Sequence, residues 1–372
     1  MLFWHLIPFN LMRMPRFKFH LAVAHQMKVV EKHMNAMSSL RLRRIMGLFL
    51  VLFLLGITIF LSLMIGAASL SFHDVWHALN SSGDAFHEAI IHDSRIPRTA
   101  IALAVGPAFG LAGALIQAFT RNPLADPGIL GVNAGAAFAV ALAVGIFSIT
   151  STSHYIWFAL IGALLASIAI YLIGSGAGKK HPTPTQITLA GVAMAAALEG
   201  ITTALSLMNA RAFYGMLNWR VGSLARRGLE ELWPILPFIA VGVILALLIA
   251  PAINTMGYGD DRATSLGVNV KFVQAVSIIA ITLLAGSATA IAGPIIFIGL
   301  MVPHCVRWFV GPDQVWIFIY SLLVAPLLLL GADIIGRIIL LPSEIPVGII
   351  TGFVGAPILL ILVRSKKASS LS

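Results

Sequence analysis

Apolar residues are grouped along the chain into about ten runs, separated by short segments rich in charged residues, proline and glycine. A helix that crosses a membrane needs about 20 apolar residues, because the hydrocarbon layer is about 30 Å thick and the backbone must form its hydrogen bonds internally. The eighth run is shorter than that and predicts a tilted or broken helix. The expected spans are 45–68, 98–119, 129–149, 155–174, 187–208, 233–252, 272–292, 294–309, 315–335 and 346–363.

The composition agrees with an all-α polytopic membrane protein. Hydrophobic residues make up 59% of the 372 positions and charged residues only 10%, with a mean hydropathy of +0.96. A soluble protein is about one quarter charged, so this chain has too few charges to cover a surface that faces water. Cys305 is the only cysteine, which excludes an internal disulfide and a thiolate metal cluster.

The net charge of +10 is concentrated at the N-terminus. Residues 1–44 hold eight lysines and arginines against Glu31 alone, whereas residues 45–372 hold 16 basic and 13 acidic residues. The predicted organisation is therefore a basic extension (1–44), a transmembrane domain (45–368) and a short tail (369–372). The extension is either an interfacial segment or the product of an upstream start, with Met34 or Met37 as the true start. A nucleic-acid partner is not indicated.

The distribution of lysine and arginine predicts that both termini lie in the cytoplasm, as an even number of spans requires. Seven arginines nevertheless fall on the opposite side, which is unusual for translocated segments and suggests a function for them. They are Arg95, Arg98, Arg211, Arg220, Arg226, Arg227 and Arg337.

Several segments that could suggest catalytic or ligand-binding motifs do not match the residues that those motifs require. Residues 174–180 resemble a phosphate-binding loop, but Ile173 and Lys180 stand where glycine and a hydroxyl residue are required. The histidines form no zinc-binding pair, so no metal site is predicted, and no nucleophile–base arrangement supports an intramembrane enzyme. Glu199 is identified as the one carboxylate deep inside a span. It is either an ion-coupling site or a residue of helix packing or of a pore.

Glycines spaced four residues apart predict close helix packing in lipid. Such pairs are Gly106/Gly110, Gly131/Gly135 and Gly348/Gly352. The segments Asp126–Gly131 and Glu344–Gly352 both place an acid, a proline and a glycine before an apolar run. This similarity fits an inverted internal repeat.

Four segments carry more specific information. They are Arg95-Ile-Pro-Arg-Thr99 continuing to Thr120–Gly135; Leu189-Ala-Gly-Val192 with Trp219-Arg-Val-Gly-Ser-Leu224; Gly257–Val268; and Gly293–His304 continuing through Asp333, Arg337 and Glu344-Ile-Pro-Val-Gly348 to Gly355-Ala-Pro357. Together, in this order, they resemble the FecCD-type permeases, the membrane subunits of ABC importers for iron–siderophore, haem and vitamin B12. The resemblance covers about residues 45–368 and implies a type II importer permease fold.

On the outer side, the resemblance implies that Arg95, Arg98 and Arg337 receive acidic residues of a substrate-binding protein. We expect them to be exposed, because free guanidinium groups bind carboxylates well. On the inner side, it implies that Gly259, Asp260, Asp261, Ala263, Leu266 and Gly267 form the coupling helix that rests on an ATPase. Asp260 is suited to cap such a helix, and Ala263, Leu266 and Gly267 to give it an apolar face.

Alignment to the family places Thr183, Pro184 and Thr185 at the cytoplasmic gate, and we assign Glu199 to the gate or pathway as well. The implied partners are a second permease subunit, identical or not, two ABC ATPases, an extracytoplasmic binding protein and membrane lipids. This chain would bind no cofactor itself, since ATP and Mg²⁺ belong to the ATPase. The implied location is the bacterial inner membrane.

The leading hypothesis is therefore a permease that imports a ferric siderophore, in preference to haem or vitamin B12, by alternating access. The alternative is a proton- or ion-coupled secondary transporter that uses Glu199. Sensitivity of transport to ATP depletion or to an uncoupler distinguishes the two.

Overall fold

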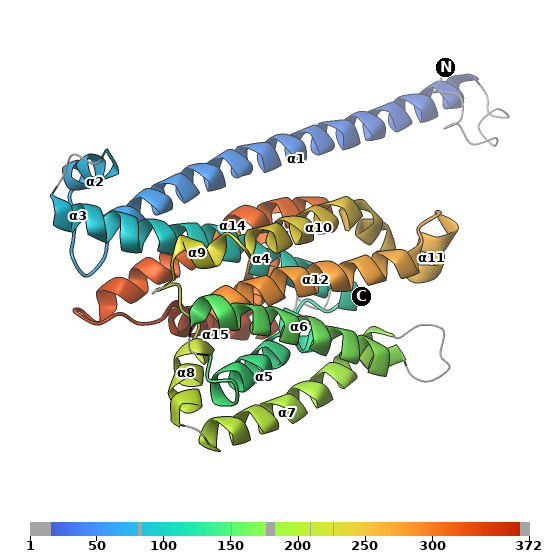
Figure 1. The fold of residues 1–372 in the computed structure, drawn as a ribbon. Helices are drawn as coiled ribbons and strands as arrows, with labels where there is room; N and C mark the ends of the chain where they lie inside the picture. The colour runs from blue at the N-terminus through green and yellow to red at the C-terminus, as the bar shows by residue number, and fades with distance from the viewer. Residues whose placement is uncertain are drawn as a thin grey trace. The chain divides into compact units, whose positions relative to one another are not determined.

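The computed structural model describes residues 16–80, 84–149, 151–175, 183–208, 210–225 and 227–364, and all regular elements in these ranges are helical (Figure 1). They are α1 (Arg16–Met64), α2 (Phe72–Leu79), α3 (Ala85–Ala89), the π-helix η3 (Ile90–Arg95), α4 (Ile96–Thr120), the 3₁₀ helix η4 (Pro127–Leu130), α5 (Val132–Gly145), α6 (Thr152–Ser175), α7 (Pro184–Met208), α8 (Ala210–Arg220), α9 (Leu229–Leu232), α10 (Leu236–Met256), α11 (Asp260–Ser265), α12 (Val270–Ala292), α13 (Ile298–Val310), α14 (Gln314–Ile339) and α15 (Val347–Arg364).

The chain divides into two compact units, Met1–Leu50 and Val51–Ser372. The second unit contains the packed helices. In it, α4 contacts α10, α12, α13 and α14, while α5, α6 and α7 pack against one another and lie side by side in Figure 1. Most residues in the apolar windows of α4 and α12 are buried, so these two helices form the core of the unit.

The predicted spans agree with the helices. Among the described residues, seven helices are long and apolar enough to cross a membrane, and three shorter apolar helices accompany them. The short eighth span is confirmed: α13 has 13 residues and follows the non-helical residues 293–297. The third span is also shorter than predicted, because Gly131 adopts a left-handed conformation between η4 and α5. Helices α2, α3 and α8 and the π-helix η3 were not predicted from the sequence.

Glycines allow the central helices to approach closely. A methyl group at Gly106 or Gly110 would overlap Pro326 or Ala325 of α14, so the predicted packing role of this pair is confirmed. Gly113 is tighter still, because a methyl group there would overlap the backbone carbonyl of Gly299 in α13.

We therefore expect Gly113→Ala to lower the stability of the protein. Two backbones would have to separate, and overpacking of this kind costs about 1–3 kcal/mol, occasionally more. Gly331→Ala in α14 is the matched control, because nothing lies within 4 Å of the added methyl group. The melting temperature of the detergent-solubilised protein measures the difference, and equal values for both variants would contradict the prediction.

Candidate functional site

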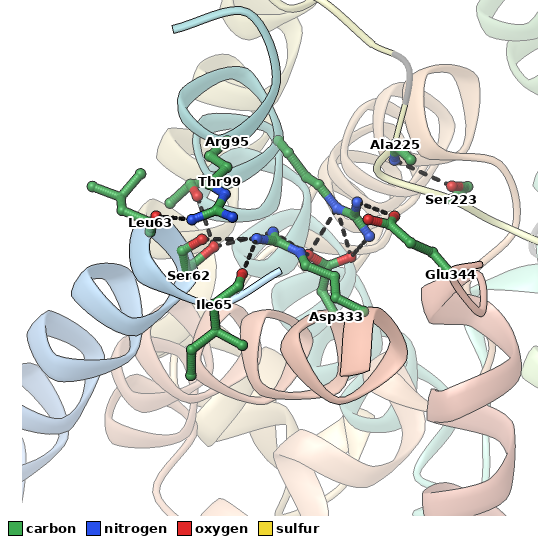
Figure 2. Close-up of polar contacts among 11 residues, drawn as sticks. Ser62, Leu63, Ile65, Arg95, Thr99, Ser223, Ala225, Asp333 and Glu344 are labelled. Carbon is green, nitrogen blue, oxygen red and sulfur yellow. Dashed lines mark hydrogen bonds and ion pairs between the residues drawn. The ribbon is translucent and has the colours of Figure 1, made fainter. Parts of the chain in front are cut away.

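A cluster of charged side chains joins the ends of four segments of the second unit (Figure 2). We call Arg95, Arg98, Asp333, Arg337 and Glu344 the arginine cluster. Arg95 ends the π-helix η3 and Arg98 lies in the first turn of α4. Asp333 and Arg337 are one turn apart on α14, and Glu344 precedes α15. Five residues from four stretches of sequence thus meet at one point.

Asp333 is the centre of the arginine cluster. Its carboxylate accepts hydrogen bonds from Arg98 Nε and Nη2, at 2.9–3.0 Å and 2.7 Å, and from Arg337 Nη2 at 2.5 Å. Arg98 Nη1 also contacts Glu344 Oε2 at 2.5 Å. Asp333 is completely buried. The Asp333 carboxylate therefore binds two guanidinium groups inside the protein, and the Glu344 carboxylate binds only one of them.

The remaining donors bind the end of α1. Arg337 Nη1 donates to the carbonyl of Ser62 at 2.7 Å, and Arg95 Nη1 donates to those of Leu63 and Met64 at 2.5 and 2.8 Å. The last carbonyls of a helix have no partner within the helix and carry the negative end of its dipole, so cations are favoured there. The arginine cluster thereby attaches the end of α1 to α4 and α14.

The prediction that these arginines are exposed is wrong. Arg95 is 4% exposed, Arg98 6% and Arg337 2%. The reason is that guanidinium groups in a membrane protein need acceptors, and Asp333 with the α1 carbonyls supplies them. Their role in docking a binding protein stays a prediction, but each group would first have to leave its present partners. The identification of Glu199 as the one carboxylate deep in a span also needs correction, since Asp333 lies in a span and is buried.

The sequence held a signal for the arginine cluster. Asp333 and Arg337 are spaced i,i+4, and residues at that spacing face the same side of a helix. An acid and a base paired in this way inside an apolar run indicate an internal ion pair rather than a surface for a partner. No feature of the sequence indicated the contact between Arg98 and Asp333.

The segment between α10 and α12 forms the expected short helix, α11. Gly259 and Gly267 have φ angles of +105° and +85°, which side chains disfavour, so glycine is needed at both ends. Ala263 is buried, whereas Leu266 is 70% exposed, so the predicted apolar face is divided between the protein and the surface. Asp261 is exposed. Contact of this segment with an ATPase stays a prediction.

Asp260 does not cap α11, contrary to the sequence prediction. The cap residue is Gly259, and Asp260 is the first helical residue. Its carboxylate binds the guanidinium group of Arg121, which also donates to the carbonyl of Met256 at 3.1 Å. Arg121 therefore connects α11 to the C-terminal end of α4.

The residues assigned to the gate lie in two separate places: Thr183, Pro184 and Thr185 at the start of α7, and Glu199 further along the same helix. Thr183 and Gln186 form a capping box: the Thr183 N–H donates to Gln186 Oε1 at 2.9 Å, and the Gln186 N–H donates to Thr183 Oγ1 at 3.3 Å. Pro184 begins the helix, and Thr185 follows it in an exposed position. Glu199 lies about 21 Å further along the helix axis, at 1.5 Å per residue from Thr185.

Glu199 is paired, which the sequence did not indicate. Its carboxylate binds the guanidinium group of Arg220 at the end of α8, a residue assigned to the outside by charge distribution alone. The side chains are 51% and 38% exposed within this single chain. In the described part of the chain, no group of three or more histidine, cysteine or acidic residues could hold a metal ion.

Among the residues that the structure describes, seven helices long and apolar enough to cross a membrane, with three shorter apolar helices, define the class of a multi-pass helical membrane protein. The model of the FecCD transport family matches residues 52–365. The chain therefore belongs to the FecCD family, and the resemblance seen in the sequence motifs is confirmed.

Known relatives agree with this assignment. The chain is 46% identical over 316 residues to the ferric enterobactin transport system permease protein FepD of Escherichia coli, covering 85% of this chain and 94% of the relative. It is 36% identical to the probable siderophore transport system permease protein YfiZ of Bacillus subtilis, covering 84% and 94%. A metal-chelate type ABC transporter in an inward-facing conformation superimposes with a TM-score of 0.75 at 26% identity, covering 86% of this chain and 98% of the other.

The protein is thus an ABC importer permease, a transport subunit of the inner membrane that crosses it several times. The alternative of a proton- or ion-coupled secondary transporter is not supported, because both the family and the matching structure are of the ABC type. In addition, Glu199 is neutralised by Arg220 rather than held as an isolated acid.

Proposed function

We propose that this permease carries a ferric siderophore from an extracytoplasmic binding protein into the cytoplasm by alternating access. The observation that carries the proposal is the 46% identity, over nearly the whole length, to a ferric enterobactin permease. A hemin permease of Yersinia pestis is a more distant relative, at 35% identity over 325 residues. This difference favours a siderophore over haem.

A second permease subunit is supported by α7. This helix is apolar, yet only 17% of its apolar window is buried inside the chain. Leu189, Val192 and Leu207 on it are 58–72% exposed. Packing between membrane helices requires such a surface, and the same surface would line a pathway between two copies. We propose that the pathway runs there, with Thr183, Pro184 and Thr185 at its cytoplasmic end.

Two ABC ATPases would bind the cytoplasmic side through the segment around α11. Tyr258 and Leu266 flank this helix, and each is 70% exposed. Two projecting apolar side chains beside a charged helix suit a groove on another protein. ATP and Mg²⁺ would be used by those ATPases, and both termini of this chain would lie on their side of the membrane. The binding protein would dock on the opposite face, near the outer ends of α4 and α14.

Reconstitution tests the proposed function. The permease, co-purified with the ATPase and binding protein encoded beside it, is placed in liposomes loaded with ATP. We expect uptake of a ⁵⁵Fe-siderophore that requires ATP and the binding protein and that survives a protonophore, because ATP hydrolysis drives the conformational change. Uptake that persists without ATP and collapses with the protonophore would overturn the proposal.

A further inference from the structure

A cavity of about 540 Å³ lies beside the ion pair between Glu199 and Arg220. Its walls come from η4, α5, α7 and the end of α8, and Pro294 contributes from the break between α12 and α13. Asn133 and Trp219 also line it. Glu199 lies within the candidate membrane span Thr185–Met208 of α7, so the cavity adjoins this span.

Arg220 and Asn133 bring hydrogen-bond donors to the wall of the cavity. One nitrogen of Arg220 binds Glu199, and a guanidinium group has five N–H donors, so most of them remain for another partner. Trp219 also lines the cavity and is 3% exposed. Asn133 Oδ1 accepts from Thr289 at 3.0 Å, which leaves the amide nitrogen as a donor.

Arg220 ends α8, and the turn that follows it is fixed by contacts with neighbouring backbone. A methyl group at Gly293 would overlap the carbonyl of Trp219, and Gly222 has a φ of +70°. The Ser223 N–H donates to the carbonyl of Ala292 at 2.8 Å, and the Gly348 N–H donates to that of Gly222 at 3.1 Å. The turn that carries Trp219 and Arg220 is therefore attached both to the end of α12 and to the start of α15.

We infer that this cavity is a contact site for the cargo, which binds it as an anionic, oxygen-rich metal chelate. Arg220 would exchange the carboxylate of Glu199 for chelate oxygens, and the amide nitrogen of Asn133 would donate to another. Glu199 neutralises Arg220 between transport cycles, because an unpaired charge inside a membrane is costly. Its competition also keeps binding weak enough for release, which translocation requires. The inference rests on the proposed function and names the residues that meet the substrate.

Binding of two simple probes tests the site. The full-length permease with its partner subunits is placed in lipid nanodiscs, and quenching of tryptophan fluorescence is titrated with ferric tris-catecholate, a trianion, and with neutral ferric tris-acetohydroxamate. We expect Arg220→Gln to weaken the affinity for the trianion about tenfold, the equivalent of about 1.4 kcal/mol, and to change the affinity for the neutral complex much less. Glu199→Gln should tighten binding of the trianion, because a competing carboxylate is removed.

Lys271→Gln is the matched control, since it removes one exposed positive charge at the inner end of α12. Arg220→Lys keeps the charge and should keep most of the affinity for the trianion. If the ion pair only holds α7 and α8 together, Arg220→Gln and Glu199→Gln will shift both probes in the same direction. That result, or titrations indistinguishable from Lys271→Gln, overturns the inference.

The same nanodisc preparation separates this inference from the proposed function. Opposite shifts for the two variants without ATP-dependent uptake in liposomes would support the site and overturn the importer function. ATP-dependent uptake of a ferric siderophore with charge-independent probe binding would support the function and overturn the site.

Discussion

Replacing Asp333 with asparagine is expected to destabilise the protein more than any other single change proposed above. Asp333 is completely buried and is the only carboxylate that binds both Arg98 and Arg337 in the described structure. Its neutralisation leaves Arg337 with carbonyl and hydroxyl acceptors alone. Breaking a buried ion pair by removing one partner typically costs about 3–5 kcal/mol. We expect a large drop in melting temperature and little correctly inserted protein.

Two comparisons show whether the loss of the negative charge of Asp333 causes the expected destabilisation. Asp261→Asn is the matched control, because Asp261 is exposed on α11 and the chemical change is identical. The second is a double-mutant cycle: adding Arg337→Gln to Asp333→Asn should cost less than the sum of the two single changes, since the uncompensated cation is removed. Melting temperatures that are equal for Asp333→Asn and Asp261→Asn would contradict this account of the arginine cluster.

The second large effect is expected at α11. Changing Tyr258 and Leu266 together to aspartate should abolish ATP-dependent uptake while the melting temperature changes little. Both side chains are 70% exposed, so their replacement leaves the packing of the chain intact. Two carboxylates in an apolar groove of an ATPase, however, would be buried without partners, which is strongly unfavourable. Co-purification of the tagged permease with the ATPase measures the association directly.

Trp76→Asp is the control for this experiment. Trp76 is 59% exposed on α2, which follows the first span and so lies on the opposite side of the membrane by the predicted topology. The same kind of change there should leave ATPase association as in the unchanged protein. If the double variant at α11 still co-purifies with the ATPase and supports uptake, α11 is not the coupling element.

The spans could be predicted from the sequence because each is a local property. A run of about 20 apolar residues must cross the bilayer or be buried wherever it lies in the fold. The short helix between Gly259 and Gly267 was equally local, since glycines with positive φ mark both of its ends. The division of α11 into a buried Ala263 and an exposed Leu266 was not, because it depends on what packs beneath the helix.

The charged side chains were harder to interpret. Arg95, Arg98 and Arg337 are unusual for the side of the membrane that the charge distribution predicts for them, but the sequence did not indicate their surroundings. Arg98 binds Asp333, which is 235 positions away in the sequence. Glu199 on α7 binds Arg220 at the end of α8, a helix that was not predicted from the sequence. In both cases the missing information was the partner and not the residue.

The sequence by itself determined that this protein is a multi-pass helical membrane protein of the FecCD type, where its spans lie, and which charged residues are unusual. These properties follow from hydrophobic run length and from motifs that are short in sequence. The folded chain adds that Arg95, Arg98 and Arg337 are buried against Asp333 and the end of α1. It also adds that Glu199, Trp219 and Arg220 line one cavity. The physical reason is that a charge in a membrane must find a partner, and that partner is chosen by the packing of helices remote in sequence.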